Sequence, residues 1–357
     1  MELDIYKNKR VLITGHTGFK GSWLCYWLKT LGATVFGYST KLTVPDHFSL
    51  LNIDGDFTIA DVSDYEKLEK TIDRVKPEII FHLAAQPLVR ESYKEPLLTY
   101  RTNVIGTANL LQACRGSDTL KAIVCVTSDK CYENKEWLWG YRETEPMGGF
   151  DPYSSSKACS ELLIASFRNS FFSLDNYGES HQVLIASARA GNVIGGGDWS
   201  TDRLVPDIIR AASADKETEI RSPFSIRPWQ HVLDCLHGYL LLGSRLMSGD
   251  KNCAAAFNFG PNDSDILTVS TVLKLCKANW TKIKYKFNEE ITALHEAKIL
   301  KLDSSKAKML LKWSPLWNSE ECMKKTILWY RNFIENKIVN TSEDINAYMR
   351  GLSDRPG

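Results

Sequence analysis

A tyrosine and a lysine stand four residues apart in the run from Asp151 to Lys157, as Tyr153 and Lys157. On a helix, this spacing places both side chains on one face, one turn apart. A phenol has a pKa of about 10 and is a poor base at neutral pH, but a neighbouring ammonium favours the phenolate. Such a pair can take a proton from a substrate hydroxyl while hydride leaves the same carbon. The spacing is also common on solvated helices, so its meaning depends on the motifs around it.

Three glycines near the N-terminus have the spacing GxxGxxG: Gly15, Gly18 and Gly21. They join a predicted strand to a predicted helix, which is the context of a dinucleotide-binding turn. There, backbone amides approach a pyrophosphate, and the helix N-terminus offers free N–H groups to it. Lys20 either touches a phosphate or is solvated. The cofactor contacts expected in this loop are Gly15, Thr17, Gly18, Phe19, Lys20 and Gly21.

The ends of the next strands suggest where the rest of a dinucleotide lies. No acid stands in residues 38–41 to bind the adenosine ribose, so NAD and NADP both stay open, and Lys41 is either a 2′-phosphate ligand or an exposed loop lysine. Asp61 suits the adenine amino group, and the small residues after residue 82 leave room for the nicotinamide ribose. The cofactor contacts expected here are Ser39, Asp61, Val62, Leu83, Ala84, Ala85 and Thr102.

Ser128, Asp129 and Lys130 directly follow the fifth predicted strand. In an open parallel sheet, ligands lie at this carboxyl edge. Ser128 can hydrogen-bond a substrate hydroxyl beside Tyr153, and the next two residues supply an acid and a base. Neighbouring ionisable residues at a strand end are also typical of a solvated turn.

Alternating apolar and amphipathic segments predict a Rossmann-type doubly wound parallel sheet with a smaller C-terminal α/β lobe. We expect strands at residues 10–14, 34–38, 57–60, 78–83, 122–127 and 182–188. We expect helices at residues 21–31, 65–75, 99–114 and 153–172, with Ser63 or Asp64 capping the second and Pro152 opening the last. The NAD-binding domain should span residues 1–190, joined by a segment near 229–262, and residues 191–357 should mainly bind substrate.

Composition narrows the class of protein. The chain has 357 residues, a net charge of +1 and 24% charged residues, so no global field attracts nucleic acid or an anionic membrane. There is no apolar run of membrane-spanning length and no signal-peptide core. The nine cysteines form no CxxC pair and show no metal-ligand spacing with the histidines. We therefore expect no metal site, reduced thiols and a cytoplasmic location.

With these motifs in place, the whole chain resembles the extended short-chain dehydrogenase/reductase family. Sugar-nucleotide 4-epimerases of that family carry small residues where Asp129 and Lys130 stand, whereas its 4,6-dehydratases carry an acid, commonly Asp followed by Glu. This chain has Asp followed by Lys. Four segments resemble the CDP-glucose 4,6-dehydratase branch: residues 14–23, 86–93, 127–134 and 227–232.

The resemblance implies a reaction on CDP-glucose with NAD, within deoxysugar biosynthesis of the lipopolysaccharide type. Tyr153 would deprotonate the C4 hydroxyl, with Lys157 lowering its pKa and binding the nicotinamide ribose. Asp129 would act as the acid that expels the C6 hydroxyl. Lys130 stands where the C5 base is usually Glu; as a base it must be neutral, which burial or nearby cations favour, and its rival role is to stabilise the enolate. Glu133 is another candidate base.

The resemblance also places the substrate and a partner chain. Arg227 would pair with a diphosphate oxygen, since a guanidinium suits bidentate contact. Helices near residues 96–114 and 153–172 would form the face of a homodimer or homotetramer. Trp137, Trp139 and Trp229 either wall the pocket or pack in the core, and His231 should be structural. The expected substrate contacts are Gln86, Asn192, Arg203, Leu204, Val205 and Arg227.

Three alternatives stay open. A 4-epimerase would interconvert C4 epimers without losing water, and the pair Asp129–Lys130 argues against it. A dehydratase of another nucleotide hexose would share every motif above except those that read the base. A nucleotide-sensing protein would keep the fold without catalysis, but such proteins typically lose the Tyr153–Lys157 pair.

Overall fold

Seven parallel strands form the central sheet in the order β11-β6-β5-β4-β1-β2-β3. The computed structural model describes residues 2–40, 46–220, 222–265, 267–288 and 299–355. Paired residues at the carboxyl edge include Thr14 with both Tyr38 and His82, so the strand ends meet along one line. The strands are β1 (Arg10–Thr14), β2 (Thr34–Ser39), β3 (Asp56–Ile59), β4 (Ile79–His82), β5 (Ala122–Val126), β6 (Leu184–Ala190) and β11 (Ala256–Phe259).

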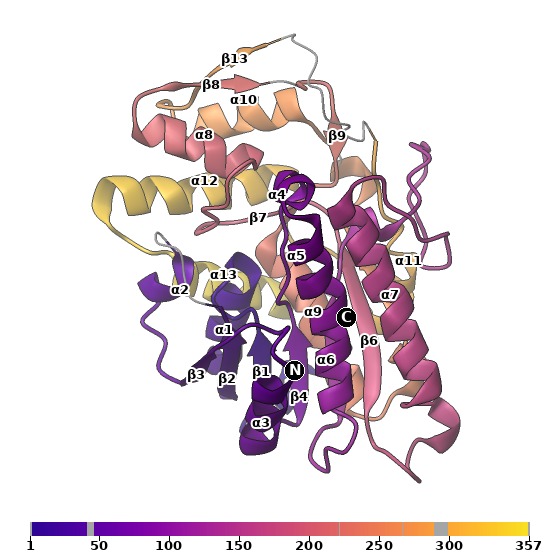
Figure 1. Cartoon of the computed structure of the whole chain (residues 1–357). Helices are drawn as coiled ribbons and strands as arrows, with labels where there is room; N and C mark the ends of the chain where they lie inside the picture. The colour runs from indigo at the N-terminus through magenta and orange to yellow at the C-terminus, as the bar shows by residue number, and fades with distance from the viewer. Residues whose placement is uncertain (1, 41–45, 221, 266, 289–298, 356–357) are drawn as a thin grey trace.

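Helices cover both faces of this sheet (Figure 1). Alternate residues of β1 point to opposite faces, as the period of a strand requires. Val11 and Ile13 join the core cluster of α1 (Phe19–Thr30) and α9 (Val232–Met247), whereas Leu12 joins that of α3 (Tyr65–Val75), α6 (Gly106–Ala113) and α7 (Pro152–Ser170). The predicted doubly wound parallel fold is confirmed.

Short elements link the sheet to its surroundings. Those before residue 180 are η1 (Glu2–Tyr6), α2 (His47–Leu50), α4 (Val89–Lys94), α5 (Pro96–Tyr100), η2 (Arg101–Ile105), η3 (Asp129–Cys131) and η4 (Leu174–Asn176). Asp64 caps α3 and Asp151 caps α7, each accepting a hydrogen bond from a backbone N–H three residues on. Of the two caps expected for α3, Asp64 is therefore the correct one.

The predicted helix near residues 99–114 runs unbroken through α5, η2 and α6, but η2 is π-helical. The hydroxyls of Thr107 and Ser160 both donate to the carbonyl of Asn103, at 2.6 and 2.9 Å, inside this widened turn. Inserted side-chain donors of this kind widen an α-helical turn. The widened turn places Thr102 on the main cavity described below.

The second lobe sits above the carboxyl edge of the sheet (Figure 1). Its β8 pairs in parallel with β13, α8 packs beside both strands, and α10 packs against α12 and β12. The elements after β6 are β7 (Val193–Ile194), α8 (Leu204–Ser213), β8 (Glu217–Ile220), β9 (Ile226–Arg227), β10 (Gln230–His231), η5 (Lys251–Cys253), η6 (Asp263–Asp265), β12 (Leu267–Thr268), α10 (Val269–Asn279), β13 (Lys284–Phe287), α11 (Ser305–Leu311), α12 (Ser319–Asn336) and α13 (Thr341–Ser353).

The C-terminal helix α13 returns to the sheet domain, beside α1 and α9. Asp234 of α9, fully buried, ties these parts together. Its carboxylate accepts from Tyr348 Oη at 2.7 Å and from the N–H of Leu316 at 2.6 Å, and its carbonyl accepts from the indole of Trp313 at 3.0 Å. No helix of the described residues is long and apolar enough to cross a membrane.

We predict that Asp234→Asn stabilises the protein at alkaline pH. Burial raises the pKa of Asp234 to about 6, although Tyr348 and a backbone N–H oppose this. An unfolded Asp titrates near about 3.9, so the folded state holds the proton more tightly and stability falls as pH rises between these values. Asparagine keeps the acceptor oxygen without the charge, so urea unfolding should show a gain of about 2 kcal/mol near pH 8 that shrinks toward pH 4. An equal gain at both pH values would contradict this.

Candidate active site

A cavity of about 1090 Å³ opens along the carboxyl edge of the sheet, beneath the second lobe. Its lining begins at the ends of β1 to β6 and continues over α8 and β8. With one exception, every predicted site residue contributes to it: Gly15, Thr17, Gly18, Phe19, Lys20, Gly21, Ser39, Asp61, Val62, Leu83, Ala84, Ala85, Thr102, Ser128, Asp129, Lys130, Tyr153, Lys157, Asn192, Arg203, Leu204, Val205 and Arg227.

The exception is Gln86. Its amide donates to the carbonyl of Leu88 at 3.0 Å and to Thr99 Oγ1 at 2.9 Å, while its own carbonyl oxygen accepts from the N–H of Leu88 at 2.6 Å. These bonds use the side chain to fold the loop between β4 and α4. Gln86 is thus engaged within this loop, and its contact with substrate stays a prediction.

The glycine turn has the shape of a phosphate cradle. Gly15 has a φ of +73°, and a Cβ there would lie 2.7 Å from the backbone nitrogen of Ala84. A Cβ on Gly21 would lie 2.0 Å from the carbonyl oxygen of Gly15. Gly18 occupies the N-cap of α1 and is exposed, with no side chain capping the helix. The first turn of α1 thus presents its N–H groups to the cavity, as an anion site requires.

The ends of β2 and β3 each add a polar contact. Thr17 Oγ1 and Ser39 Oγ are 2.7 Å apart, so the glycine turn and β2 are linked at the cavity wall. Asp61, after β3, accepts from the N–H of Ser63 at 2.8 Å and lines the cavity. Lys41, the candidate 2′-phosphate ligand, lies outside the described residues.

The turn after β5 buries an acid. Ser128 Oγ donates to Asp129 Oδ1 at 2.9 Å and accepts from the N–H of Lys130 at 3.2 Å. Asp129 is 3% exposed, and its Oδ2 has no hydrogen-bond partner among the residues that the structure describes. Burial raises the pKa of Asp129, although Lys130 and Ser128 oppose the shift. A carboxyl group that keeps its proton more readily suits a general acid.

Tyr153 and Lys157 project from the first turns of α7 into the same cavity, and both are buried. Burial is the largest cause that raises the pKa of Tyr153, to about 12, although Ser128 and Arg203 lower it. Burial lowers the pKa of Lys157 to about 8, and Lys20 adds to this effect. Loss of solvation therefore outweighs the nearby cations in the protein without ligands, and the lowering of this pKa by Lys157 stays a prediction.

The two candidate bases differ in placement. Lys130 is half-buried, and its Nζ lies 6.0 Å from the centre of the Tyr153 ring. The side chain of Glu133 is 50% exposed and pairs with Lys135. Both residues line the cavity, and Lys130 is the more buried of the two.

The aromatic and histidine candidates lie where packing needs them. Trp229 is buried and lines the cavity, whereas Trp139 is 62% exposed and Trp137 packs against Tyr141 at a ring distance of 5.5 Å. His231 caps α9 by accepting from the N–H of Leu233 at 3.2 Å. Its structural role is thus the one expected from the sequence.

Sequence analysis missed two ion pairs at the cavity. Arg203 pairs with Asp198 at 2.9 Å on one wall, and Arg90 of α4 pairs with Asp202 at 3.2 Å across the two lobes. Arg90 belongs to the 86–93 segment that carried the family resemblance, which was a usable signal. Its partner stands 112 positions away, and no sequence pattern joins the two.

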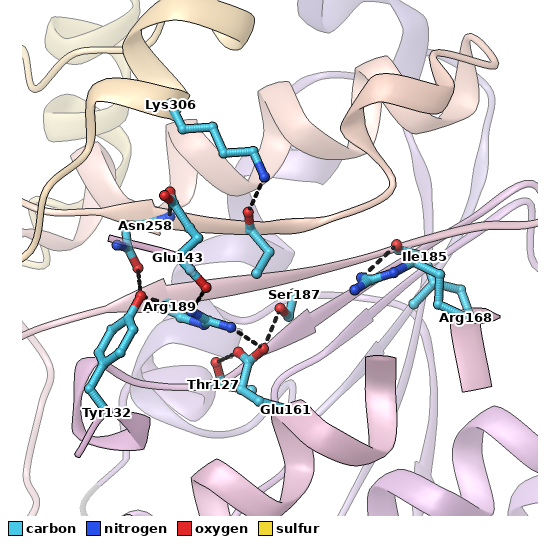
Figure 2. A network of polar contacts seen from close by, with 11 residues as sticks. Thr127, Tyr132, Glu143, Glu161, Arg168, Ile185, Ser187, Arg189, Asn258 and Lys306 are labelled. Atoms are coloured by element: carbon cyan, nitrogen blue, oxygen red, sulfur yellow. Dashed lines mark hydrogen bonds and ion pairs between the residues drawn. The ribbon is translucent and has the colours of Figure 1, made fainter. Parts of the chain in front are cut away.

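A buried network behind the cavity was also missed. Glu161 of α7 and Arg189 of β6 form an ion pair of 2.8 Å with side chains 4% and 5% exposed (Figure 2). The carboxylate also accepts from Thr127 and Ser187. Glu161 follows Lys157 by one helical turn, so the sequence places both on one face of the helix. The sequence does not predict that Arg189 is the partner of Glu161.

Comparisons with known proteins identify the family. Residues 12–326 match the family described as GDP-mannose 4,6-dehydratase. The CDP-glucose 4,6-dehydratase of Salmonella typhimurium is 47% identical over 354 residues, covering 98% of each chain.

Solved structures agree in fold. An epimerase of Methanothermobacter thermautotrophicus has a TM-score of 0.81 at 21% identity, covering 97% of this chain and 96% of its own. UDP-glucose 4-epimerase of Thermotoga maritima, solved with UDP-glucose, has a TM-score of 0.77 at 23% identity, covering 91% and 99%. The family resemblance inferred from sequence is confirmed.

We predict that Asp151→Asn moves the pH dependence of catalysis to lower pH. The charge of Asp151 raises the pKa of Tyr153, and asparagine caps a helix nearly as well as aspartate. The variant should lose less than about 0.5 kcal/mol of stability. In single-turnover oxidation of a nucleotide hexose, the rise of rate with pH should begin earlier than in the parent protein.

Asp64→Asn is the matched control, because Asp64 caps α3 in the same manner. It should leave the pH profile unchanged. An unshifted or upward-shifted profile for Asp151→Asn would remove Asp151 from the electrostatics of Tyr153.

Proposed function

The chain belongs to the GDP-mannose 4,6-dehydratase family, and from this we propose that it is an NAD-dependent hydro-lyase acting on CDP-glucose. The product would be CDP-4-keto-6-deoxyglucose, an intermediate for deoxysugar and lipopolysaccharide biosynthesis. The observation that carries the proposal is that one cavity holds both a buried Tyr153–Lys157 pair and a buried acid, Asp129. The choice of CDP rests on the 47% identical relative that carries this name.

The residues of this chain fit the cofactor. The glycine turn leaves no room for a Cβ at Gly15 or Gly21 and exposes the N-terminus of α1. These features would hold the pyrophosphate, with Asp61 at the adenine and Lys157 at the nicotinamide ribose. When bound, NAD supplies the hydride acceptor for C4 and the hydride donor for C6, so it is regenerated in each cycle.

The first chemical step belongs to Tyr153. Its phenolate takes the proton of the C4 hydroxyl, while Ser128 orients that hydroxyl. The resulting 4-ketone makes the C5 proton acidic. Lys157 assists as an ammonium below its lowered pKa of about 8. Ser128 and Arg203 lower the pKa of Tyr153 against the effect of burial and so favour the base.

The second step belongs to the turn after β5. Lys130 takes the proton from C5, and Asp129 gives a proton to the C6 hydroxyl, which leaves as water. Lys130 then returns a proton to C5 as C6 is reduced. Tyr153 gains one proton and Asp129 loses one, and Ser128 touches both groups, so the cycle closes with a single water lost.

The substrate's diphosphate would lie between the lobes. Arg227 and Asn192 line the cavity on one side, and Arg203 lines it at the start of α8. Guanidinium groups suit phosphate oxygens because they can donate two parallel hydrogen bonds. Leu204 and Val205, also on the cavity wall, would lie near the cytosine.

The rival functions are weaker on these observations. A 4-epimerase has no use for a buried acid beside the sugar, and Asp129 has a raised pKa and an unpartnered oxygen. A protein that only senses nucleotides does not need Tyr153 and Lys157 side by side, with pKa values that burial shifts.

We also propose a homodimer in a reducing compartment, the cytoplasm. Apolar side chains stand exposed on α5, η2 and α7, including Leu97 at 79%, Ile105 at 51% and Leu162 at 61%. These adjacent helices offer one surface that a second copy would cover. All nine cysteines are free thiols. Light scattering of the purified protein would test the dimer against a monomer or a tetramer.

Incubation with NAD and each of CDP-, dTDP-, GDP- and UDP-linked hexoses tests the activity. We expect the 4-keto-6-deoxy product from CDP-glucose, with no net NADH, and at least about 100-fold less from the others. Product formed only from another nucleotide hexose would show that the enzyme recognises a nucleotide other than CDP. Inversion at C4 without water loss would establish the epimerase instead.

We predict that Lys130→Ala separates the two halves of the reaction. The variant should oxidise C4 at near the parental rate, but C5 proton exchange with solvent and water loss should fall by about 100-fold or more. Deuterium uptake in heavy water and product formation measure these steps. Normal product formation would show that Lys130 is not the base.

Glu133→Ala is the control for the other candidate base. Glu133 is exposed and already paired with Lys135, so its loss should leave C5 exchange unchanged. A loss seen only in this variant would assign the base to Glu133.

A further inference from the structure

Glu161 is a buried carboxylate without a role in the chemistry above. It stands on α7, one turn beyond Lys157 on the same face. Its carboxylate accepts from Arg189 Nη2 at 2.8 Å, from Ser187 Oγ at 2.7 Å and from Thr127 Oγ1 (Figure 2). One side chain of α7 is therefore bonded directly to β6 and to Thr127, the residue that follows β5.

The bond to Thr127 reaches the dehydrating turn. Thr127 immediately precedes Ser128, Asp129 and Lys130. Its hydroxyl is held by Glu161, and its N–H donates to the carbonyl of Ala188 at 2.9 Å. The start of the turn is thus fixed to α7 and to β6.

The bond to Arg189 reaches the other end of the same turn. Arg189 Nη1 donates to Tyr132 Oη at 2.8 Å and to the carbonyl of Glu143 at 3.1 Å (Figure 2). Tyr132 is the residue directly after η3, and its hydroxyl donates to Asn258 Oδ1 of β11 at 2.7 Å. The turn from residue 128 to 131 is therefore held at both ends by one ion pair.

Stability alone is a weak reason for this arrangement. Two charges this deeply buried lose their solvation, and a well-packed apolar pair of equal volume is often at least as stable. Burial would raise the pKa of Glu161, but Arg189, Thr127 and Ser187 bring it below its ordinary value. The carboxylate is thus kept charged and fully bonded, which fixes direction as well as distance.

The proposed reaction needs such fixed geometry. Tyr153 acts at C4, while Asp129 and Lys130 act at C6 and C5 of the same sugar ring, from a different element of the fold. We propose that the Glu161–Arg189 ion pair is the positioning element that keeps the dehydrating turn in register with the oxidising helix. The effect of this ion pair on catalysis rests on the proposed function, whereas its restraint of residues 128–131 does not.

Glu161→Gln tests the proposal through the balance of the two half-reactions. Oxidation of C4 should stay within about 3-fold of the parent, since Tyr153 and Lys157 remain on their helix, while C5 exchange and water loss should fall about 100-fold. The intermediate with reduced cofactor should then accumulate in single turnover. A parallel fall of both half-reactions, or no fall, would overturn the positioning role.

Thr127→Val removes only the hydrogen bond from Thr127 to Glu161 and leaves the ion pair with Arg189 intact. It therefore serves as the test if Glu161→Gln folds poorly. It should shift the balance in the same direction by a smaller factor. Asp344→Asn is the matched control: it breaks an ion pair of 3.2 Å with Lys325, between α12 and α13, whose side chains are 8% and 24% exposed. Its two half-reactions should keep the parental ratio.

Amide hydrogen exchange separates this inference from the proposed function, since it needs no substrate. The amides of residues 128–132 should exchange faster in Glu161→Gln and Thr127→Val than in the parent or Asp344→Asn. Unchanged exchange there would refute the hold on the turn, whatever the activity. Failure of the parent protein to act on CDP-glucose would instead refute the proposed function and leave the exchange result standing.

Discussion

Loss of solvation at the carboxyl edge of β5 is the physical constraint on which the site depends. Asp129, Tyr153 and Lys157 are all nearly removed from water. Burial disfavours the charged form of each group, so it raises the pKa of the acid and of the phenol and lowers that of the lysine. A raised pKa suits Asp129 as a general acid. A raised pKa hinders Tyr153 as a base, and Ser128 and Arg203 lower it again in part.

The fold makes this burial possible because it brings the ends of several strands together. Parallel strands end along one line, so a glycine turn, an acidic turn and the first turn of α7 meet without any element leaving the sheet. The second lobe closes the same edge from above (Figure 1). Segments separated by long stretches of chain therefore converge on one cavity, and the oxidising and dehydrating groups reach it from different elements.

Local patterns were enough to predict much of this. Gly15, Gly18 and Gly21 are legible because their strand and helix adjoin them, and Tyr153 and Lys157 because a helix has a fixed period. Contacts between residues far apart in the sequence could not be predicted. Three such contacts depend on tertiary packing, which produces no periodic pattern in the sequence. They are the hydrogen bonds of Gln86 within its loop, the ion pair of Arg90 with Asp202 and the hydrogen bond from Tyr348 of α13 to Asp234. The net pKa of Tyr153 is not predictable from the sequence either, since sequence cannot weigh burial against charge.

Transfer of a label within one turnover tests the central claim most directly: a single site oxidises C4, expels water and returns the same hydride. With CDP-glucose deuterated at C4, we predict that the deuterium appears at C6 of the 4-keto-6-deoxy product, while one hydrogen from solvent enters at C5. Deuterium that stays at C4, escapes to solvent or accumulates in free reduced cofactor would contradict the account.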